Sequence, residues 1–475
     1  MALPSASNTV LAAPDRWVCV LSVLDGCTEA SLYTMIVFSP WAFGTTELWS
    51  MRWMNLGGYA LGLLLVAKVL LRRCAAPSSR DIRARRLGLA LFALTLCILG
   101  YVLVSAINAE FTYVAAEWRQ EPHPHVEWLP HSLDRNATWQ VFWNWLALAC
   151  VFWAVHDWLL DDVGLDGRRS ARRLRRLVFI LTLNAALVAF EGILQRNSGT
   201  AKLLWFKATR ENRDASAQFG PYAYRSNAAQ FLNLIWPAAL GLWWQHLQLQ
   251  RRTERHHWLL PCVMLLVAGS LVSLSRGGVG VTILQLGACG LLLLAWGKFS
   301  TASRLGLVFV FVITLGAAAY LGWDGIAKRF HDTAADPLSG RRATYELAAR
   351  MTEDYPWFGV GPGAFDSVFQ LYRHSPTDYW PAQLHNDWLE YLITFGRVGC
   401  VMLLAAMALI AWRWFAPGGI RMHWTFAAFL WIALGGCLLH ARFDFPLQIY
   451  SIQFVFVLLC AMLFSVSRFP PRGGI

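Results

Sequence analysis

The sequence predicts an all-α polytopic membrane protein. Of its 475 residues, 56% are hydrophobic and only 15% are charged, a balance too apolar for a soluble protein of this length. The apolar residues recur in runs of about 20, which is the length of a helix that crosses a bilayer. Tryptophan is frequent, with 25 residues, as in the aromatic belts of membrane interfaces, although sugar-stacking sites would use the same residue.

About twelve apolar runs predict membrane-spanning helices. They lie near residues 17–43, 54–71, 87–107, 139–160, 174–194, 226–247, 257–274, 278–296, 304–322, 388–414, 423–440 and 446–466. Pro40 interrupts the first run, so a broken or tilted helix is an alternative to a straight one there. The first residues are polar and no small-residue cleavage site follows this run, so we expect it to remain as a helix.

Arginine-rich connections orient these spans. They lie at 72–86, 161–173 and 248–256, and all three fall on one side when the spans are counted. The positive-inside rule makes this side cytoplasmic, and both termini with it. The same rule explains the formal net charge of +12, so we expect membrane lipids and no nucleic acid as partners.

The connections on the opposite side divide the chain into three parts. These are residues 1–322, with nine spans and outer loops near 108–138 and 195–225, residues 323–387, a large outer loop that contains helices, and residues 388–475, with the last three spans. The loop at 195–225 is basic, although topology gives no reason for positive charge outside. We therefore expect it to bind an anionic substrate, with Arg210 and Arg213 among its ligands.

An arginine interrupts the apolar sequence in SLSRGGVGV. This residue, Arg276, is predicted at the outer face near hydrocarbon depth, where a charge costs about 2.5 to 3.5 kcal/mol on insertion scales. Gly277 and Gly278 would let a ligand or another backbone approach closely. The alternative is an arginine that snorkels at a helix turn. We favour a functional role, because an intramembrane charge is a site candidate by default.

The basic loop ends in FGPYAYRSNAAQF, where a helix is predicted to begin. Ser226 would be its N-cap, and Arg225 and Asn227 flank this serine as candidate substrate ligands. A helix N-terminus beside an arginine suits an anion. An ordinary capped helix start explains the motif equally well.

The large outer loop contains PLSGRRATYELAARMTEDYPWFGVGPGAF. Its hydrophobic spacing predicts an amphipathic helix from about Arg341 to Thr352, which Pro356 ends. Arg341 and Arg342 at the start of this helix are candidate anion ligands, with a solvated charged face as the alternative. The glycines that follow lack the GK[ST] ending of a phosphate loop, so they are predicted to form turns.

His385 is the strongest general-base candidate on the outer side. It lies in AQLHNDWLEYL, directly before an apolar run, and an imidazole can accept a proton near neutral pH. Asn386, Asp387 and Glu390 stand nearby to orient it or to cap the helix, and Asn386 is also a candidate substrate ligand. A lone histidine is more often structural, but the arginines expected on the same side favour chemistry.

These residue types suit transfer from a lipid-anchored diphosphate. Guanidinium groups bind phosphate oxygens bidentately and keep their charge, and a base deprotonates the attacking hydroxyl. The scheme needs no metal and no other cofactor, and the sequence has no DxD or CxxC pair.

Near the C-terminus, HARFDFPLQI places Arg442 and Asp444 in a short outer turn. The two form either a wall of the site or a structural latch, and we favour the latch.

The motifs FGPYAYRSN, SLSRGG, RRATYELAARMTEDYPWFGVGPGAF, LHNDWLEYLITFGRVG and HARFDFPLQI together resemble the O-antigen ligase and polymerase superfamily. The resemblance covers roughly residues 200–450. Each motif alone is weak, and their specificity comes from their order together with a large outer loop that ends in His-Asn. The first five spans match only in general hydropathy.

The resemblance implies a glycosyltransferase of the GT-C type in the bacterial inner membrane, with its active site at the periplasmic face. It implies a donor glycan on undecaprenyl diphosphate and an acceptor hydroxyl that expels the diphosphate with inversion and without a metal. The family's catalytic histidine falls on His385, and its diphosphate-binding arginines fall on Arg225, Arg276 and either Arg341 or Arg342. The acceptor is the lipid A core in ligases, a second lipid-linked repeat unit in polymerases, and a protein hydroxyl in related transferases. No ligase-specific motif stands out, which favours a polymerase.

Two other functions would also use arginines at this face. A transporter or flippase for a lipid-linked anionic glycan would line a cavity with them, but it would not need a large outer loop that ends in a base. A lipid-diphosphate phosphatase would need a nucleophilic histidine with a second acid or base, and no pairing of histidines is evident in the sequence.

Overall fold

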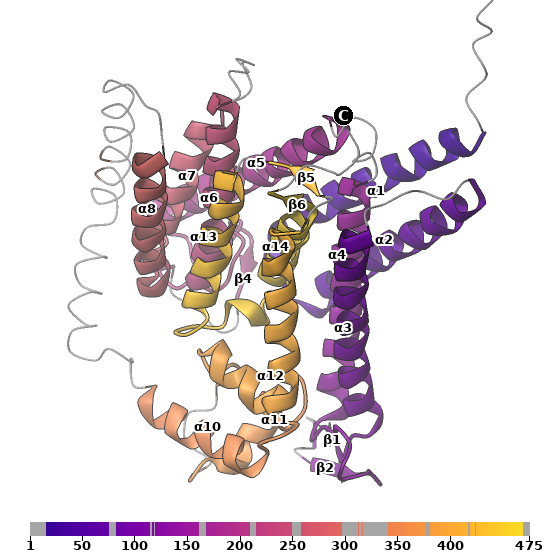
Figure 1. The fold of residues 1–475 in the computed structure, drawn as a ribbon. Coiled ribbons are helices and arrows are strands. Elements are labelled where there is room, and N and C mark those ends of the chain that lie inside the picture. The colour runs from indigo at the N-terminus through magenta and orange to yellow at the C-terminus, as the bar shows by residue number, and fades with distance from the viewer. Residues whose placement is uncertain are drawn as a thin grey trace, which may run out of the picture.

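Long helices form most of the computed structural model (Figure 1). It describes residues 16–75, 82–114, 116–117, 119–160, 168–209, 215–248, 258–296, 312, 316, 341–375, 381–416, 419–422 and 424–468. The helices are α1 (Arg16–Trp41), α2 (Leu48–Ala75), α3 (Ile82–Ile107), α4 (Arg135–Leu160), α5 (Arg168–Ser198), α6 (Arg225–Gln248), α7 (Leu259–Val272), α8 (Arg276–Trp296), α10 (Arg342–Asp354), α11 (Phe365–Phe369), α12 (Asp387–Arg413), α13 (Trp424–His440) and α14 (Tyr450–Ser465). Single turns of 3₁₀ helix are η1 (Phe43–Thr45), η3 (Gln370–Tyr372) and η4 (Pro446–Gln448).

Short strands form three two-stranded sheets among the described residues. The antiparallel pairs are β1 (Phe111–Val114) with β2 (Arg119–Pro122), and β3 (Lys202–Leu203) with β4 (Lys207–Ala208). The parallel pair is β5 (Ile420–Arg421) with β6 (Val466–Ser467). These sheets lie in connections between helices, so the helical bundle carries the fold.

The helices coincide with the predicted spans wherever both are described. Seven of the described helices, α1 to α5, α8 and α12, are long and apolar enough to cross a membrane. The helices α7, α13 and α14 are apolar but shorter, and the predicted span at 304–322 lies outside the described residues. Pro40 lies in the last turn of α1, so it marks the end of this helix rather than a break. The prediction of a helical, multi-span membrane protein is confirmed.

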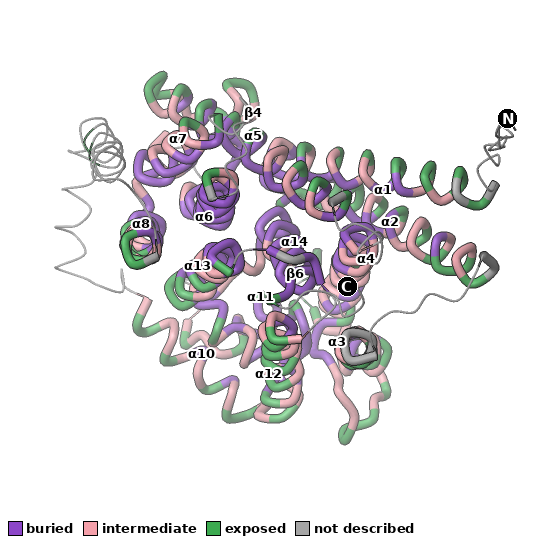
Figure 2. The backbone as a smooth tube through the Cα atoms, turned by 45° about the horizontal axis from the view of Figure 1, so that its top comes forward, coloured by how far each residue is buried: buried purple, intermediate pink, exposed green. Residues whose placement is uncertain are grey.

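α6 is enclosed by other helices, and Figure 2 shows it almost entirely in the colour of buried residues. It packs against α5, α7, α8, α13 and α14. Its polar residue Asn233 is paired inside the protein, since Nδ2 donates to the carbonyl of Gly278 at 3.0 Å and Oδ1 accepts from the Thr282 hydroxyl at 2.9 Å. An enclosed helix meets protein instead of lipid, so it tolerates polar residues that a lipid-facing helix would not. The start of α6, which carries Arg225, is thereby fixed in the interior.

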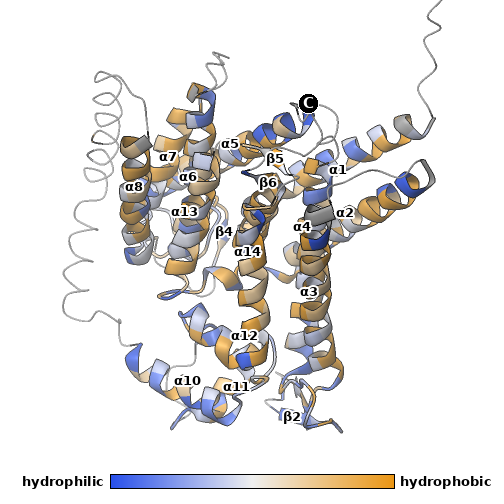
Figure 3. Cartoon of the chain, viewed as in Figure 1, coloured by the Kyte–Doolittle hydropathy of each residue, from blue (hydrophilic) through white to orange (hydrophobic). Residues whose placement is uncertain are grey.

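Several connections between the helices gather at one end of the bundle. The connections predicted on the outer side form β1, β2, α10 and α11, which gather at one end (Figure 1). Figure 3 shows α10 and β2 as largely hydrophilic, whereas α3, α8 and α14 are mostly hydrophobic along their length. β5 and β6 lie near the opposite end. The predicted outer loop near 108–138 and the described part of the large outer loop therefore share one end of the protein.

α12 is broken inside its length by a conformation that only glycine adopts readily. Gly396 has φ 59° and ψ −172°. Carbonyl groups at the break are satisfied by a segment of the large outer loop, because the N–H of Val360 donates to Ile393 O at 2.8 Å and that of Gly361 to Thr394 O at 3.1 Å. The loop thus completes the hydrogen bonding of the broken helix.

The glycine-rich segment of this loop forms the turns that the sequence predicts. Gly359, Gly361 and Gly363 all have positive φ, at 71°, 105° and 81°. The approach to α12 is so close that a Cβ atom on Gly396 would lie 2.3 Å from the carbonyl oxygen of Trp357. The break and the loop therefore fix the first turns of α12, which directly follow His385.

Candidate functional site

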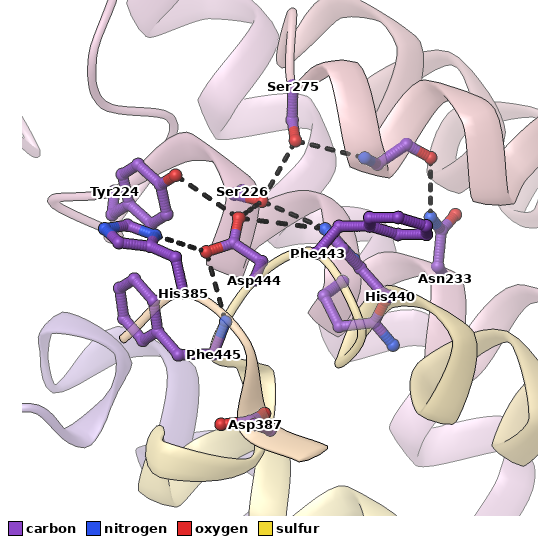
Figure 4. A network of polar contacts seen from close by, with 12 residues as sticks. Tyr224, Ser226, Asn233, Ser275, His385, Asp387, His440, Phe443, Asp444 and Phe445 are labelled. Atoms are coloured by element: carbon purple, nitrogen blue, oxygen red, sulfur yellow. Dashed lines mark hydrogen bonds and ion pairs between the residues drawn. The ribbon is translucent and has the colours of Figure 1, made fainter. Parts of the chain in front are cut away.

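Asp444 is the centre of a polar network between the turn that follows α13 and the start of α12 (Figure 4). Its Oδ1 lies 2.9 Å from Nδ1 of His385 and accepts the backbone N–H of Phe445 at 3.1 Å. Its Oδ2 accepts hydrogen bonds from Ser226 Oγ at 2.5 Å and from Tyr224 Oη at 3.2 Å. Groups from three distant segments therefore meet on one buried carboxylate.

These donors keep Asp444 ionised. Burial alone would raise the pKa of its carboxyl group, but the hydrogen bonds from His385 and Ser226 are among the causes that outweigh burial and lower the pKa to about 2. Because an ionised carboxylate can only accept, the proton in its contact with His385 is carried by Nδ1. In the neutral imidazole, Nε2 is then the basic atom that can accept a proton from a substrate.

The backbone of His385 is held in a conformation that is uncommon for residues other than glycine. Its φ is 59°. The next residue, Asn386, is the N-cap of α12 and accepts the N–H of Leu389 at 3.3 Å. On the other side, the hydroxyl of Tyr345 in α10 donates to the His385 carbonyl at 2.8 Å. Contacts from two helices therefore maintain the strained residue, while its side chain remains 17% exposed.

Two aromatic rings fix the plane of the imidazole. Phe445 and Tyr224 stack on each other with ring centroids 5.3 Å apart, and each meets the His385 ring edge to face, at 4.7 and 5.9 Å. Burial raises the pKa of Tyr224, so its hydroxyl stays protonated and donates to Asp444. The rings thus restrict His385 to the orientation in which Nδ1 faces the carboxylate.

Asp387 and Glu390 fix the backbone around the histidine. The N–H of Asp387 reaches the carbonyl of Asp444 at 3.2 Å, and its Oδ2 accepts the N–H of Leu447 at 2.7 Å. Glu390 Oε2 accepts the N–H of Leu384 at 2.7 Å. Of the two roles considered for these carboxylates, orienting the histidine and holding the helix start, they perform the second.

Ser226 connects the network to the starts of two further helices. Its Oγ accepts a hydrogen bond from Ser275 Oγ at 3.0 Å. Arg225, the first residue of α6, directly precedes Ser226, and Arg276, the first residue of α8, directly follows Ser275. The structure thus brings both helix starts beside the carboxylate. The prediction that Ser226 caps α6 is wrong, because its side chain donates to Asp444 and the helix already begins at Arg225.

Backbone carbonyls hold the neighbouring basic loop in place. Arg225 Nη1 donates to the carbonyl of Ser216. Arg196, near the end of α5, donates through Nη2 to the carbonyls of Gln218 at 3.0 Å and Ser273 at 3.1 Å. Arg196 therefore ties the loop before α6 to the turn before α8. The sequence marks Arg196 only as one basic residue of the outer loop, because its long-range carbonyl partners leave no local pattern.

The two adjacent arginines of the large loop point to different places. Arg341 Nη1 donates to the carbonyl of Phe443 at 3.1 Å, and its charge acts on the neighbouring Asp444. The side chain of Arg342 is 81% exposed and pairs with Glu346 at 2.9 Å, one turn along α10. Arg341 therefore belongs to the network, whereas Arg342 forms the solvated charged face that was its alternative.

The remaining predicted ligands have other structural roles or lie outside the described residues. Asn386 is engaged as the cap of α12, and Asn227 is buried in the first turn of α6. Arg210 and Arg213 lie outside the described residues. For the Arg442–Asp444 pair, the structure directs the Asp444 carboxylate to His385, which favours the alternative of a site wall over the latch.

His440 is the residue that the sequence reasoning missed. Its Nε2 lies 3.1 Å from Ser226 Oγ and 3.9 Å from Asp444 Oδ2, and its Nδ1 lies 2.6 Å from Gln230 Oε1. Two histidines therefore flank Asp444, contrary to the expectation that no histidines are paired. The sequence signal that could have revealed this contact is the spacing of four residues between His440 and Asp444 at the end of an apolar run. Because His440 is only 1% exposed, it does not reach a substrate as a nucleophile.

The groups that this site offers to an anion are guanidinium groups. Arg225 directly precedes Ser226, which donates to Asp444, and Arg341 donates to the carbonyl of Phe443, which directly precedes Asp444. Arg276 is one step further away, because it follows Ser275, which donates to Ser226. Among the described residues, no three histidine, cysteine, aspartate or glutamate side chains are placed to hold a metal ion. The chemistry that the arrangement supports is therefore proton transfer at His385 beside bound negative charge.

Comparison with known families gives one match. A family model described as O-antigen ligase matches residues 261–404, from α7 into α12. This range includes Arg276, Arg341 and His385, while Arg225 and Asp444 lie outside it. No curated protein matches the chain. Residues 261–404 are thus similar to the O-antigen ligase family, and the predicted resemblance of this membrane protein to the O-antigen ligase and polymerase superfamily is confirmed over this range.

Proposed function

We propose that the chain transfers a glycan from undecaprenyl diphosphate to a sugar hydroxyl at the periplasmic face of the inner membrane. One observation carries the proposal. The pair of His385 and Asp444 adjoins the starts of α6 and α8, where Arg225 and Arg276 lie. A positioned base next to permanent positive charge is what transfer from a diphosphate requires.

Arg225, Arg276 and Arg341 bind the diphosphate in this proposal. Guanidinium forks match pairs of phosphate oxygens and hold their charge at any working pH. Negative charge grows on the departing oxygen as its bond to the sugar breaks, so these contacts strengthen in the transition state and lower the barrier. The arginines thus perform the charge stabilisation, and the scheme needs no metal.

His385 Nε2 takes the proton of the acceptor hydroxyl. The oxygen forms a bond to the anomeric carbon of the donor while the bond from that carbon to the diphosphate breaks. The proton remains on the imidazolium, which Asp444 stabilises across the 2.9 Å contact, and later leaves to water. A single displacement of this kind inverts the anomeric carbon. The base contributes a factor of about 10² to 10⁴ in rate.

The acceptor distinguishes the members of this superfamily. We infer a polymerase, in which the attacking hydroxyl belongs to a second lipid-linked repeat unit. In a ligase the same base would act on a hydroxyl of the lipid A core, so the proposed chemistry at His385 is common to both. Product size separates the two, because only a polymerase makes a ladder of repeat units from the lipid-linked glycan alone.

The test uses purified protein in lipid nanodiscs with a defined undecaprenyl-diphosphate glycan, with and without lipid A core. Wild-type protein should give a ladder of products, while Arg276→Ala and Arg225→Ala should give none and accumulate donor. Arg276→Lys should recover activity only in part, because the bidentate fork is lost. Arg342→Ala is the matched control and should retain wild-type yield, since Arg342 pairs only with Glu346 across solvent among the contacts described.

A transporter or flippase predicts a different result. In that case, His385→Ala would leave product yield and chain length unchanged in cells, and purified protein would move donor between leaflets without releasing undecaprenyl diphosphate. Release of undecaprenyl diphosphate in step with product supports the transferase and excludes this alternative.

A further inference from the structure

The structure assigns a positioning role to His440. We infer that this buried imidazole holds Asp444, through Ser226, in the orientation that His385 requires, and the inference rests on the function proposed above. His440 ends α13 and Asp444 follows four residues later, with the Asp444 N–H donating to the His440 carbonyl at 3.0 Å. Both side chains meet Ser226 of α6 (Figure 4). One serine therefore bridges them from another helix.

Counting protons around Ser226 fixes the direction of each bond. A hydroxyl has one proton and two acceptor positions. The proton of Ser226 is directed at Asp444, 2.5 Å away, and Ser275 donates to one acceptor position from 3.0 Å. His440 Nε2, at 3.1 Å, must then donate to the second acceptor position. Its proton therefore lies on Nε2.

Gln230 completes the protonation state of His440. Burial disfavours the charged imidazolium, so with a proton on Nε2 the Nδ1 atom of His440 accepts. The neighbouring Gln230 amide then presents its nitrogen to Nδ1 rather than the oxygen placed there at 2.6 Å, an exchange of two atoms of nearly identical shape. As placed, Gln230 Nε2 is buried without a hydrogen-bond partner among the described residues. The exchange gives this nitrogen a partner.

The result is a chain of donors that runs in one direction onto the carboxylate. Gln230 donates to His440, His440 to Ser226, and Ser226 to Oδ2 of Asp444. With Oδ2 held in this way, Oδ1 faces His385 Nδ1. The first turn of α8 closes over the chain, since a Cβ on Gly277 would lie 2.8 Å from His440 Nε2. Loss of the His440 donor leaves one acceptor position of Ser226 Oγ unpaired and weakens the hydrogen bond from Ser226 to the Asp444 carboxylate.

Three variants test this role. His440→Met keeps an apolar side chain of similar length without a donor, and His440→Gln keeps an amide N–H near the position of Nε2. Ser226→Ala removes the bridge. We expect His440→Met to lower kcat by roughly ten- to a hundredfold, as for loss of a hydrogen bond that supports a charged group, with the donor KM within about threefold of wild type. His440→Gln should restore most of this loss.

Combining the substitutions shows whether His440 acts through Ser226. The double variant H440M/S226A should be no slower than Ser226→Ala alone, because both changes break one chain. Wild-type kcat for His440→Met, equal losses for His440→Met and His440→Gln, or losses that multiply in the double variant would overturn the inference. If His440→Met fails to fold, His440→Gln and Ser226→Ala still decide, since kcat of His440→Gln must lie well above that of Ser226→Ala.

Two controls separate this inference from the proposed function. His156→Met removes another histidine that contacts a serine, Ser465, at 2.9 Å on α14, and should leave kcat unchanged. Asp444→Asn tests the base itself. If Asp444→Asn abolishes transfer while His440→Met does not affect it, only the role of His440 fails. If Asp444→Asn is also fully active, the mechanism proposed at His385 fails with it.

Discussion

Replacing Asp444 by asparagine tests the pairing of the carboxylate with His385. The substitution preserves shape but removes the negative charge, and it places an amide where four donors now converge from His385, Ser226, Tyr224 and the Phe445 backbone. An amide cannot accept all of these bonds, because its nitrogen only donates. We expect His385 to lose both its orientation and the partner of its protonated form.

The contact distance sets the size of the effect. Unit charges on Nδ1 of protonated His385 and on Oδ1, 2.9 Å apart, attract each other by about 6 kcal/mol at an effective dielectric constant near 20. Hydrogen bonds to charged groups contribute about 1.5 to 3 kcal/mol when measured by substitution. The amide retains a weaker contact, so we expect a loss of about 3 to 5 kcal/mol in transition-state stabilisation, which lowers kcat about 10² to 10⁴-fold.

The assay is the initial rate of glycan transfer by purified protein at saturating donor, with Tm measured on the same samples. Asp134→Asn is the matched control. Asp134 is buried at the same polar end of the bundle and caps the start of α4, a role that asparagine also fulfils. A kcat for Asp444→Asn within threefold of wild type, in folded protein, would refute the assigned role of the carboxylate.

Three further predictions concern other parts of the structure. Arg341→Ala should lower kcat/KM for the donor at least about tenfold, as for loss of a charge-assisted contact. Arg342→Ala should keep kcat/KM within twofold of wild type, and equal effects of the two variants would contradict the assignment of Arg341. Gly396→Ala should lower the free energy of unfolding by at least about 2 kcal/mol, because φ is strained for alanine and the added Cβ would clash with the Trp357 carbonyl. Gly290→Ala is the control, since its Cβ would meet nothing within 4 Å, and it should leave Tm unchanged or higher. Because the pKa of Asp444 is lowered to about 2, below its unfolded value of about 4, its stabilisation is complete above pH 4 and is lost as pH falls through 2. The Tm difference between wild type and Asp444→Asn should therefore shrink as pH falls from 4 towards 2, and a difference that stays constant across that range would contradict this.

The sequence predicted most of the helices because membrane spans are defined by local composition. Apolar runs of sufficient length are visible without knowledge of the fold. The same reasoning selected Arg225, Arg276 and His385 as candidates, since charged or titratable residues beside apolar runs are unusual. It did not show that α6 is enclosed, because the burial of a helix depends on which neighbours surround it.

The contacts that build the site could not be predicted from local sequence patterns. Asp444 and His385 lie 59 residues apart and Ser226 and Asp444 lie 218 apart, so no spacing rule joins them. Asp387 and Glu390 were the nearer carboxylates in sequence, but the turns of α12 direct them to backbone N–H groups. The sequence analysis missed His440 because a histidine at the end of an apolar run resembles an ordinary residue of the membrane interface.

The role of Gly396 also could not be derived from the sequence. A glycine inside an apolar helix is common in membranes, and only the fold shows that a loop enters at this position. The hydrogen bonds from Val360 and Gly361 to the broken helix connect two segments whose motifs seemed independent.

The central claim is that His385 removes the acceptor proton while the arginines bind the donor diphosphate. A single-turnover experiment on His385→Ala measures this most directly, with donor binding and release of undecaprenyl diphosphate followed in the same sample. The account predicts wild-type donor affinity and a transfer rate reduced at least about 10²-fold. Transfer at the wild-type rate by this variant would contradict the account.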